Sequence, residues 1–326
     1  MDIKILDKTN CTQEISDKTN CTQEISDKMN GAQEISNKMN GTQEIYYSDG
    51  LIGSRFTYFE GKFHGKCESW YHNGNIKSVA NYSYGILNGD FCQWYENSNI
   101  HITCHYLNGE YDGKYDEWYE NGQKYITCNY SNGLLDGQYI RVYESGLPEI
   151  DCNYHDGKLD GAYTEYYPNG SCCVECQYID GVLEGSYKKW YENSYVCAQY
   201  NYSIGLLDGE YMKWSPNGFL NMVCNYSHGL LNGQYKEMYD SGQVKIECQY
   251  INNKKNGRYS ERFPNGSLYI NCYYVDGKKY GTYHQWFPNH KDQIVCSYID
   301  DEIHSKYKEW NEAGKLIIEL DLADLK

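Results

Sequence analysis

Short stretches of the chain alternate between apolar and polar residues. In the stretch 100–106, every second residue is apolar or aromatic and the residues between them are polar. A period of two is expected of a β-strand that buries one face. Similar stretches recur along most of the chain and are separated by segments rich in Gly and Asn, which favour turns. The pattern predicts an all-β protein built from many short strands.

A column of glycines defines a repeat of 24 residues. Counting this glycine as position 1, units begin at every 24th residue from Gly41 to Ser305, and no insertion or deletion interrupts the twelve units. Position 3 is Tyr in every unit from Tyr115 to Tyr307, and position 18 is Tyr in every unit from Tyr58 to Tyr298. Arrays of this kind grow by addition of units and need no closed globular core. The expected fold is an elongated, single-sheet antiparallel array of β-hairpins.

Each unit is expected to form one hairpin. Positions 2–7 form a first strand, positions 8–10 a tight turn with Asn-Gly or a related pair, and positions 11–18 a second strand. The even positions 12, 14, 16 and 18 are expected to share one apolar face. Positions 19–24 are expected to be a return loop, anchored on the sheet by its Leu.

Two turn types fit the hairpin, and they place its aromatic residues differently. A two-residue Asn-Gly turn puts the Tyr residues of positions 3 and 7 on the apolar face. A type I turn followed by a left-handed Gly puts the Trp of position 6 there instead, because a one-residue slip exchanges the faces. The second turn suits the prolines that occupy position 8, which are Pro168, Pro216, Pro264 and Pro288. The sequence leaves this register open.

The two ends of the chain depart from the hairpin pattern. A decapeptide that begins at Asp7 recurs at Asp17, Asp27 and Asn37 with one aliphatic side chain in each copy, which is too little to fold alone. Residues 1–40 are interpreted as a low-complexity segment, with a polar β-like cap as the alternative, and residues 41–326 as the repeat array. The segment 316–322 is expected to be a degenerate last strand that caps the array.

The charge of the chain bears on its partners. The 45 acidic and 29 basic side chains give a formal net charge of −16, which disfavours nucleic acid and anionic lipid. No run of Lys or Arg that could form a local basic patch is evident. The N-terminus lacks the apolar stretch of a signal peptide, and no segment has the length of a transmembrane helix. We therefore expect a cytoplasmic protein whose 15 cysteines are thiols.

Cysteine is the first residue type to test for chemistry. Position 16 holds eight of the cysteines, and successive members lie roughly 10 Å apart, too far for a disulfide or one shared metal ion. They are interpreted as small buried hydrophobes. Cys173 and Cys176 have a metal-like spacing, but residues i and i+3 of a strand point to opposite faces, so this spacing is interpreted as accidental.

No constellation for catalysis is visible in the sequence. Acidic residues recur in every unit without a distinctive pair, and the acidic or Asn residues of position 24 are interpreted as turn residues. The nine histidines are scattered over unrelated columns. We expect no catalytic residue, no cofactor, no metal site and no small-molecule substrate.

The tryptophans form the most suggestive column. All seven occupy position 6, and their main role is expected to be packing of each hairpin against the next. They are also the candidate aromatic residues for binding a partner. The column consists of Trp70, Trp94, Trp118, Trp190, Trp214, Trp286 and Trp310.

The repeat resembles a known family. The segment 60–65, Glu-Gly-Lys-Phe-His-Gly, is similar to the core of a MORN repeat, and the segments 108–115 and 156–163 are similar to it as well. The fuller pattern Gly-x-x-x-Gly-x-Tyr-x-x-Trp-Tyr-x-Asn-Gly resembles the divergent MORN variant of giant DNA viruses and of bacterial repeat proteins described as antitoxins. The resemblance covers roughly residues 41–324 and implies a MORN-like ribbon that acts by interaction.

The leading functional hypothesis is a non-catalytic scaffold that binds protein partners of unknown identity along an extended β surface. One alternative is an antitoxin-like inhibitor of a single partner enzyme. Another is a module that binds membrane lipid or glycan through exposed aromatic residues, although the acidic charge makes lipid a poor partner.

Overall fold

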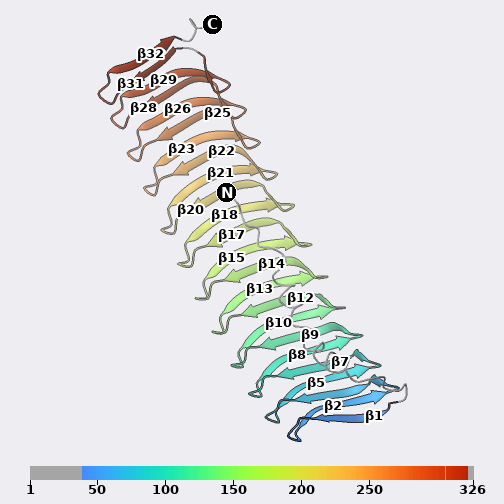
Figure 1. Ribbon diagram of the computed structural model, residues 1–326. Coiled ribbons are helices and arrows are strands. Elements are labelled where there is room, and N and C mark those ends of the chain that lie inside the picture. Colours follow the sequence, from blue (N-terminus) through green and yellow to red (C-terminus); the bar gives the residue numbers. More distant parts are fainter. Residues whose placement is uncertain (1–38, 305, 322–326) are drawn as a thin grey trace.

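The protein is one long antiparallel sheet with a repeating hairpin. The computed structural model describes residues 39–304 and 306–321 and contains 32 strands in a single sheet, with no helix in these residues (Figure 1). Each strand pairs with its neighbours in the sequence, as β4 (Gly65–Trp70) does with β5 (Ile76–Ser83). The predicted all-β, single-sheet hairpin array is confirmed.

Three kinds of strand alternate along the sheet. The strands that hold positions 1–6 are β1 (Gly41–Tyr46), β4 (Gly65–Trp70), β7 (Gly89–Trp94), β12 (Gly137–Val142), β17 (Gly185–Trp190), β20 (Gly209–Trp214), β25 (Gly257–Arg262), β28 (Gly281–Trp286) and β31 (Lys306–Trp310), with longer versions in β9 (Glu110–Trp118), β14 (Lys158–Tyr166) and β22 (Leu230–Met238). The strands that begin at position 12 are β2 (Ile52–Phe59), β5 (Ile76–Ser83), β8 (Ile100–Leu107), β10 (Lys124–Ser131), β13 (Pro148–His155), β15 (Cys172–Ile179), β18 (Val196–Ser203), β21 (Leu220–Ser227), β23 (Val244–Ile251), β26 (Leu268–Val275), β29 (Asp292–Ile299) and β32 (Leu316–Asp321). The two-residue strands are β3 (Lys62–Phe63), β6 (Ile86–Leu87), β11 (Leu134–Leu135), β16 (Val182–Leu183), β19 (Leu206–Leu207), β24 (Lys254–Lys255), β27 (Lys278–Lys279) and β30 (Glu302–Ile303).

The hairpin turn spans positions 7–10, as in Tyr71–Gly74. The amide of Gly74 donates to the carbonyl oxygen of Tyr71 at 2.9 Å, and the amide of Tyr71 donates to the carbonyl oxygen of Asn75 at 2.8 Å. Gly74 has a φ of 85°. These features define a type I turn followed by a left-handed Gly as a bulge, which is the turn that the prolines of position 8 favour.

A second irregularity in the same hairpin reverses the effect of the first. Ser69 lies opposite Ser78, but Trp70 lies opposite Ile76, so Lys77 is an extra residue on its strand. The same shift occurs in every hairpin, from β1–β2 to β31–β32. Because each one-residue shift exchanges the faces, the two shifts together keep the Tyr residues of positions 3 and 7 on the apolar face. The tryptophans of position 6 lie on the opposite face.

The extra residue also changes which positions are apolar. The prediction that position 12 lies on the apolar face is wrong, because Lys124 of this column contacts Asp116 at 2.9 Å and lies 5.3 Å from the ring centroid of Trp118. Position 13 takes its place, as shown by Arg141 of position 5, which pairs with Glu149 of position 13 at 2.8 Å. We call positions 3, 5, 7, 13, 14, 16, 18 and 23 the tyrosine face, and positions 2, 4, 6, 12, 15 and 17 the tryptophan face.

The return segment is a tight hairpin of its own, which corrects the prediction of a loop over positions 19–24. Asn108 and Gly109 have φ values of 52° and 91°, as in a type I′ turn. The turn joins β8 to β9, with Tyr106 opposite Tyr111 and Leu107 opposite Glu110. A two-residue turn was one of two alternatives for the first turn of the unit, and the structure has it instead at positions 20–21.

The glycine of position 1 is a third irregularity of the unit. Gly89 has a φ of 111°, a conformation that residues with a side chain rarely adopt. A Cβ atom at this position would lie 3.2 Å from the Cβ atom of Asn81. The backbone conformation explains why glycine recurs in this column, and close packing adds to it at Gly89 and Gly233.

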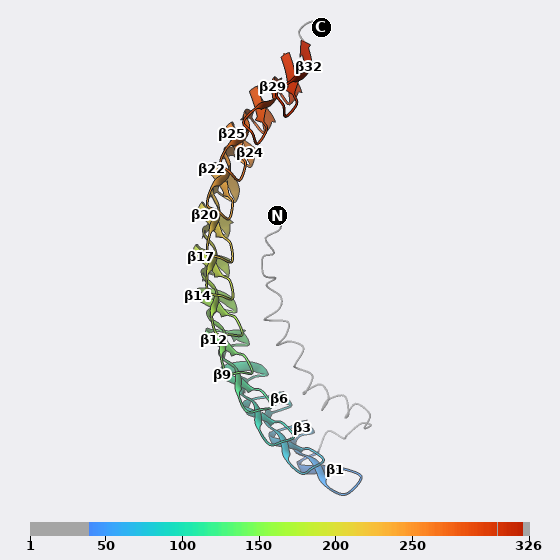
Figure 2. The same cartoon turned by 90° about the vertical axis from the view of Figure 1, so that its left-hand side faces the viewer.

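The tyrosine face forms the core. Ile102, Tyr115, Cys128 and Tyr139 belong to one buried cluster, and Leu135 of β11 packs in it. Figure 2 shows that the ribbon bends into an arc, with the short strands β3 and β6 on its concave side. Since these short strands carry the position-23 side chains of the tyrosine face, this face lines the concave side.

The ends of the described sheet are β1 and β32. β1 coincides with the second half of the fourth decapeptide copy, and among the described residues it pairs with β2. Met39 packs against Phe56 and Tyr58, and its carbonyl oxygen accepts a hydrogen bond from Gly61 at 2.9 Å. The interpretation of residues 1–40 falls almost wholly on residues 1–38, which lie outside the described residues. β32 pairs with β31, as expected of a last strand.

Candidate interaction surfaces

The tryptophan face carries all seven candidate partner-binding residues. Each Trp lies just before a type I turn, and each is half-buried. Cationic and imidazole side chains of neighbouring columns cover several of the rings. The guanidinium carbon of Arg55 lies 5.4 Å from the ring centroid of Trp70, and the ring of His284 stacks on that of Trp286 at 3.8 Å. The face therefore presents aromatic rings with positively charged neighbours, which suits cation–π contacts.

Hydrogen bonds between units hold the backbone at five of the seven tryptophans. The hydroxyl of Tyr71 donates to the carbonyl oxygen of Trp94 at 2.7 Å, and Tyr95 repeats this contact with Trp118 at 2.7 Å. At the turn, the side-chain amide of Asn73 donates to a backbone oxygen of the next turn at 3.1 Å. The Asn of position 9 thus links neighbouring turns. Sequence reasoning explained it only as a turn residue.

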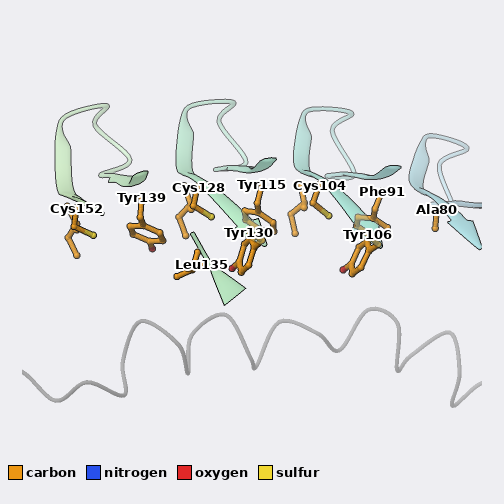
Figure 3. Packing of buried hydrophobic residues seen from close by; sticks show 13 residues of the cluster. Ala80, Phe91, Cys104, Tyr106, Tyr115, Cys128, Tyr130, Leu135, Tyr139 and Cys152 are labelled. Atoms are coloured by element: carbon orange, nitrogen blue, oxygen red, sulfur yellow. The ribbon is translucent and has the colours of Figure 1, made fainter. Parts of the chain in front are cut away.

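The cysteine column lies at the centre of the tyrosine face. Figure 3 shows Cys104, Cys128 and Cys152 pointing to the same side of the sheet as Tyr115 and Tyr139. Cys128 is completely buried. Burial raises the pKa of the Cys104 and Cys128 thiols to about 12. Such thiols are protonated near neutral pH and are poor nucleophiles. The prediction that this column is a set of small buried hydrophobes is confirmed.

Cys173 requires a correction. The sequence argument placed Cys173 and Cys176 on opposite faces, but the extra residue at position 13 brings both to the tyrosine face. Burial raises the pKa of both thiols, to about 12 for Cys176. Within residues 39–304 and 306–321, no group of three or more His, Cys, Asp or Glu side chains is placed to hold a metal ion. None of the described segments is an apolar helix of membrane-spanning length.

Position 23 of the tyrosine face contains a break in the repeat that sequence reasoning missed. Most units place an aliphatic or aromatic side chain there, but two consecutive units place Lys255 and Lys279. A search for runs of basic residues overlooks this pair because its members are 24 residues apart. Comparison within the column would have found it. The other members among the described units are Phe63, Leu87, Tyr111, Leu135, Leu159, Leu183, Leu207, Leu231 and Ile303.

The side chain of Lys255 lies over two tyrosine rings. Its ammonium nitrogen is 4.5 Å from the ring centroid of Tyr259 and 5.1 Å from that of Tyr274. Both rings belong to the core cluster of the C-terminal units, and Lys255 is half-buried. Lysine here keeps its alkyl stem against the rings that leucine covers in other units, while its charge stays near the surface.

Lys279 repeats this arrangement in the next unit. Its ammonium nitrogen is 5.2 Å from the ring centroid of Tyr283 and 4.9 Å from that of Tyr298. Neither Lys255 nor Lys279 forms an ion pair with a carboxylate of the described residues. We call these two lysines and the four rings the lysine–tyrosine site. A search of the sequence for runs of Lys or Arg did not identify this pair.

The pattern of the MORN repeat variant matches three segments, residues 63–84, 159–180 and 231–252. The segments begin at the same position of the unit, since their starts differ by whole multiples of 24. Each runs from the return strand through one full hairpin. This chain is a divergent MORN-repeat protein. The remaining units that the structure describes share the hairpin and its irregularities with the matched ones.

Comparison of this MORN array with solved structures returns much larger chains. The crystal structure of TcdB2-TccC3 matches with a TM-score of 0.14 and 10% sequence identity, over 86% of this chain and 21% of that chain. The crystal structure of TcdB2-TccC3 without its hypervariable C-terminal region matches with a TM-score of 0.17 and 10% identity, over 86% and 18%. The MORN array thus spans about a fifth of each solved chain. A sequence comparison with curated proteins finds no match.

Proposed function

We propose that this MORN-repeat protein is a non-catalytic scaffold that binds partner proteins along the tryptophan face. MORN repeats are generally associated with protein or membrane-lipid interaction. The observation that carries the proposal is the column of half-buried tryptophans, one in most units, of which five accept an inter-unit hydrogen bond at their backbone carbonyl oxygen. Trp is enriched among the residues that dominate binding energy in protein interfaces. A fixed backbone lowers the entropic cost of ordering such a surface on binding.

The proposal includes a cytoplasmic location, in host cytoplasm if the chain is viral. The thirteen cysteines of the described residues are free thiols, and eight of them line the buried column of position 16. A chain with this many unpaired thiols suits a reducing compartment.

The experiment is affinity purification of partners from the native cell with the full chain as bait. The test variant carries Trp118→Val and Trp190→Met, which place at position 6 the residues that other units carry there, Val142 and Met238. We expect the wild-type chain to recover a partner at near-stoichiometric amounts. The variant should recover at least about tenfold less of the same partner.

The control variant carries Glu120→Ala and Glu192→Ala at two exposed turns. It should retain the partner, and both variants should give the circular dichroism spectrum of the wild type. Equal recovery by wild type and tryptophan variant would remove the tryptophan face from the proposal. A measurable turnover that one point mutation abolishes would overturn the non-catalytic function.

A further inference from the structure

The lysine–tyrosine site differs in charge from the rest of the chain. Residues 244–286 carry seven Lys or Arg and three Asp or Glu, a formal charge of +4, within a chain of net charge −16. The site occupies the concave side of the arc near its C-terminal end, on β24 and β27 and the strands beside them (Figure 2). A cationic patch on an acidic protein selects for a local anionic ligand by charge complementarity.

A neighbouring lysine on β24 forms the ion pair that the two lysines of the site lack within the described part of the chain. Lys254, one residue before Lys255, points to the other side of β24 and pairs with Asp276 at 2.8 Å. Lys255 and Lys279 instead hold their charges over tyrosine rings, without a carboxylate partner among the described residues. Both residues are half-buried and keep their charges near the surface, so an anion that reaches them from the concave side gains a charge-assisted contact.

The spacing of the two charges restricts the ligand. Lys255 and Lys279 are equivalent residues of consecutive units, two strands apart, so their columns are separated by roughly 10 Å along the ribbon. A polypeptide in an extended or polyproline II conformation advances about 3.1–3.3 Å per residue. Acidic side chains three residues apart in such a segment match the spacing of the two ammonium groups.

We propose that the lysine–tyrosine site binds an acidic, extended segment of a partner protein. Two carboxylates of this segment, three residues apart, contact the ammonium groups of Lys255 and Lys279. The segment lies along the ribbon axis, and its backbone and apolar atoms pack on the partly exposed rings of Tyr274 and Tyr298. This inference deepens the proposed scaffold function, on which it rests, because it gives one binding site of the array and the chemistry of its partner.

The probe is a fluorescein-labelled dodecapeptide in which Glu-Pro-Pro is repeated four times. Proline holds the peptide in the polyproline II conformation, which places its carboxylates about 9 Å apart. A second dodecapeptide of the same composition carries its four Glu residues in one block. Fluorescence anisotropy with the full chain measures the dissociation constants of both peptides, at low and at physiological ionic strength.

The test variant replaces Lys255 and Lys279 with Leu, the residue that most other units carry at position 23. The matched control replaces Lys254 and Lys278 with Leu, which position 22 accepts in units with Leu134, Leu206 or Leu230. Both variants lose two charges from β24 and β27, and they differ in the face that loses them. We expect the test variant to bind the spaced peptide at least about tenfold more weakly than the wild type, and the control to change less than about threefold.

The spaced peptide should bind more tightly than the block peptide, and its binding should weaken as salt rises because the charges are screened. Equal losses in both variants would mean that only net charge matters and would overturn the site. Vesicles that contain phosphatidylserine, and a single-stranded oligonucleotide, are measured in parallel. Binding of either one, with loss in the test variant and no peptide binding by the wild type, would overturn the choice of an acidic protein segment.

The outcome is separable from that of the scaffold proposal. If the peptide does not bind while the tryptophan variant still loses a partner from the native cell, the lysine–tyrosine site is wrong and the scaffold function stands. If the peptide binds as expected while no partner depends on the tryptophan face, the site stands and the face assigned to the scaffold function is wrong.

Discussion

On the tyrosine face, the side chains of Cys128, Cys152 and Cys224 are at most 1% exposed, whereas every Trp of the opposite face remains half-exposed. Both faces belong to the same single layer and are built by the same units. The tyrosine face lines the concave side of the arc, where bending brings side chains of neighbouring strands together. One face of a single-layer sheet can therefore serve as a core without a second layer, while the other face stays available for partners.

The largest difference between the faces is expected from truncation of an aromatic side chain. Tyr139 on the tyrosine face is 2% exposed, and we expect Tyr139→Ala to lower the free energy of unfolding by about 3–5 kcal/mol. Trp190 on the tryptophan face is half-buried, and Trp190→Ala should cost about 1–2 kcal/mol. Urea unfolding followed by circular dichroism measures both. Equal costs would show that the tryptophan face is also a core.

The ionisation of buried thiols should make the tyrosine face sensitive to alkali. Burial raises the pKa of Cys104, Cys128 and Cys176 to about 12, while an exposed thiol in the unfolded chain ionises near its ordinary value of 9. The unfolded chain therefore loses these protons first, and the stability present below pH 9 should fall as the pH rises toward 12. Thermal melts across this range measure the effect.

The triple variant Cys104→Ala, Cys128→Ala, Cys176→Ala is the control for this pH dependence. Alanine occupies the same column at Ala80, so the repeat accepts it. The variant should show a shallower loss of stability above pH 9. An unchanged slope would assign the alkaline transition to the buried tyrosines of this face.

A smaller effect is expected from the hydrogen bonds that couple neighbouring units. Tyr95→Phe removes the hydroxyl that donates to the carbonyl oxygen of Trp118 at 2.7 Å, and should cost about 0.5–1.5 kcal/mol of unfolding free energy. Phe263 and Phe287 show that the column accepts the ring alone. Tyr84→Phe, at an exposed turn, is the matched control and should leave the melting temperature unchanged. Equal effects of the two variants would refute the coupling.

The smallest expected effect is a gain in stability at the return turn. Ile204 is 81% exposed and has a φ of 50°, a conformation that a β-branched residue adopts at a cost. Asn108 and Asn132 hold the same position in other units. We expect Ile204→Asn to raise the free energy of unfolding by about 0.5–1 kcal/mol, measured by urea unfolding. The control Ile179→Asn lies in a strand and should not stabilise the protein.

Much of the fold follows from the spacing of residue types alone. The 24-residue period, the strand-forming alternation and the Tyr and Cys columns at positions 3, 18 and 16 predicted the hairpin array and its buried face. Position 16 was assigned to the core on spacing and residue type, and Cys128 is completely buried. These features are local and repeat in every unit, so side-chain periodicity is sufficient to find them.

The candidate surfaces were predictable only in part. The column of tryptophans is visible in the sequence. The sequence also shows Lys at positions 255 and 279, where most other units have Leu. The lysine–tyrosine site is not visible in a search along the chain, because its two lysines become neighbours only when equivalent positions of consecutive units are aligned. Its tyrosine partners come from four different strands, β25, β26, β28 and β29.

The sequence by itself determined that this protein is a periodic β-hairpin ribbon and which columns are aromatic, thiol or glycine. Only the tertiary structure decided which face carries the tryptophans. A type I turn with a left-handed Gly would by itself place the tryptophans on the apolar face, and the extra residue of each hairpin, such as Lys77, places them on the opposite face. A bulge depends on pairing with the neighbouring strand, so it leaves no signature in the alternation of a single strand, yet it exchanges every side chain beyond it.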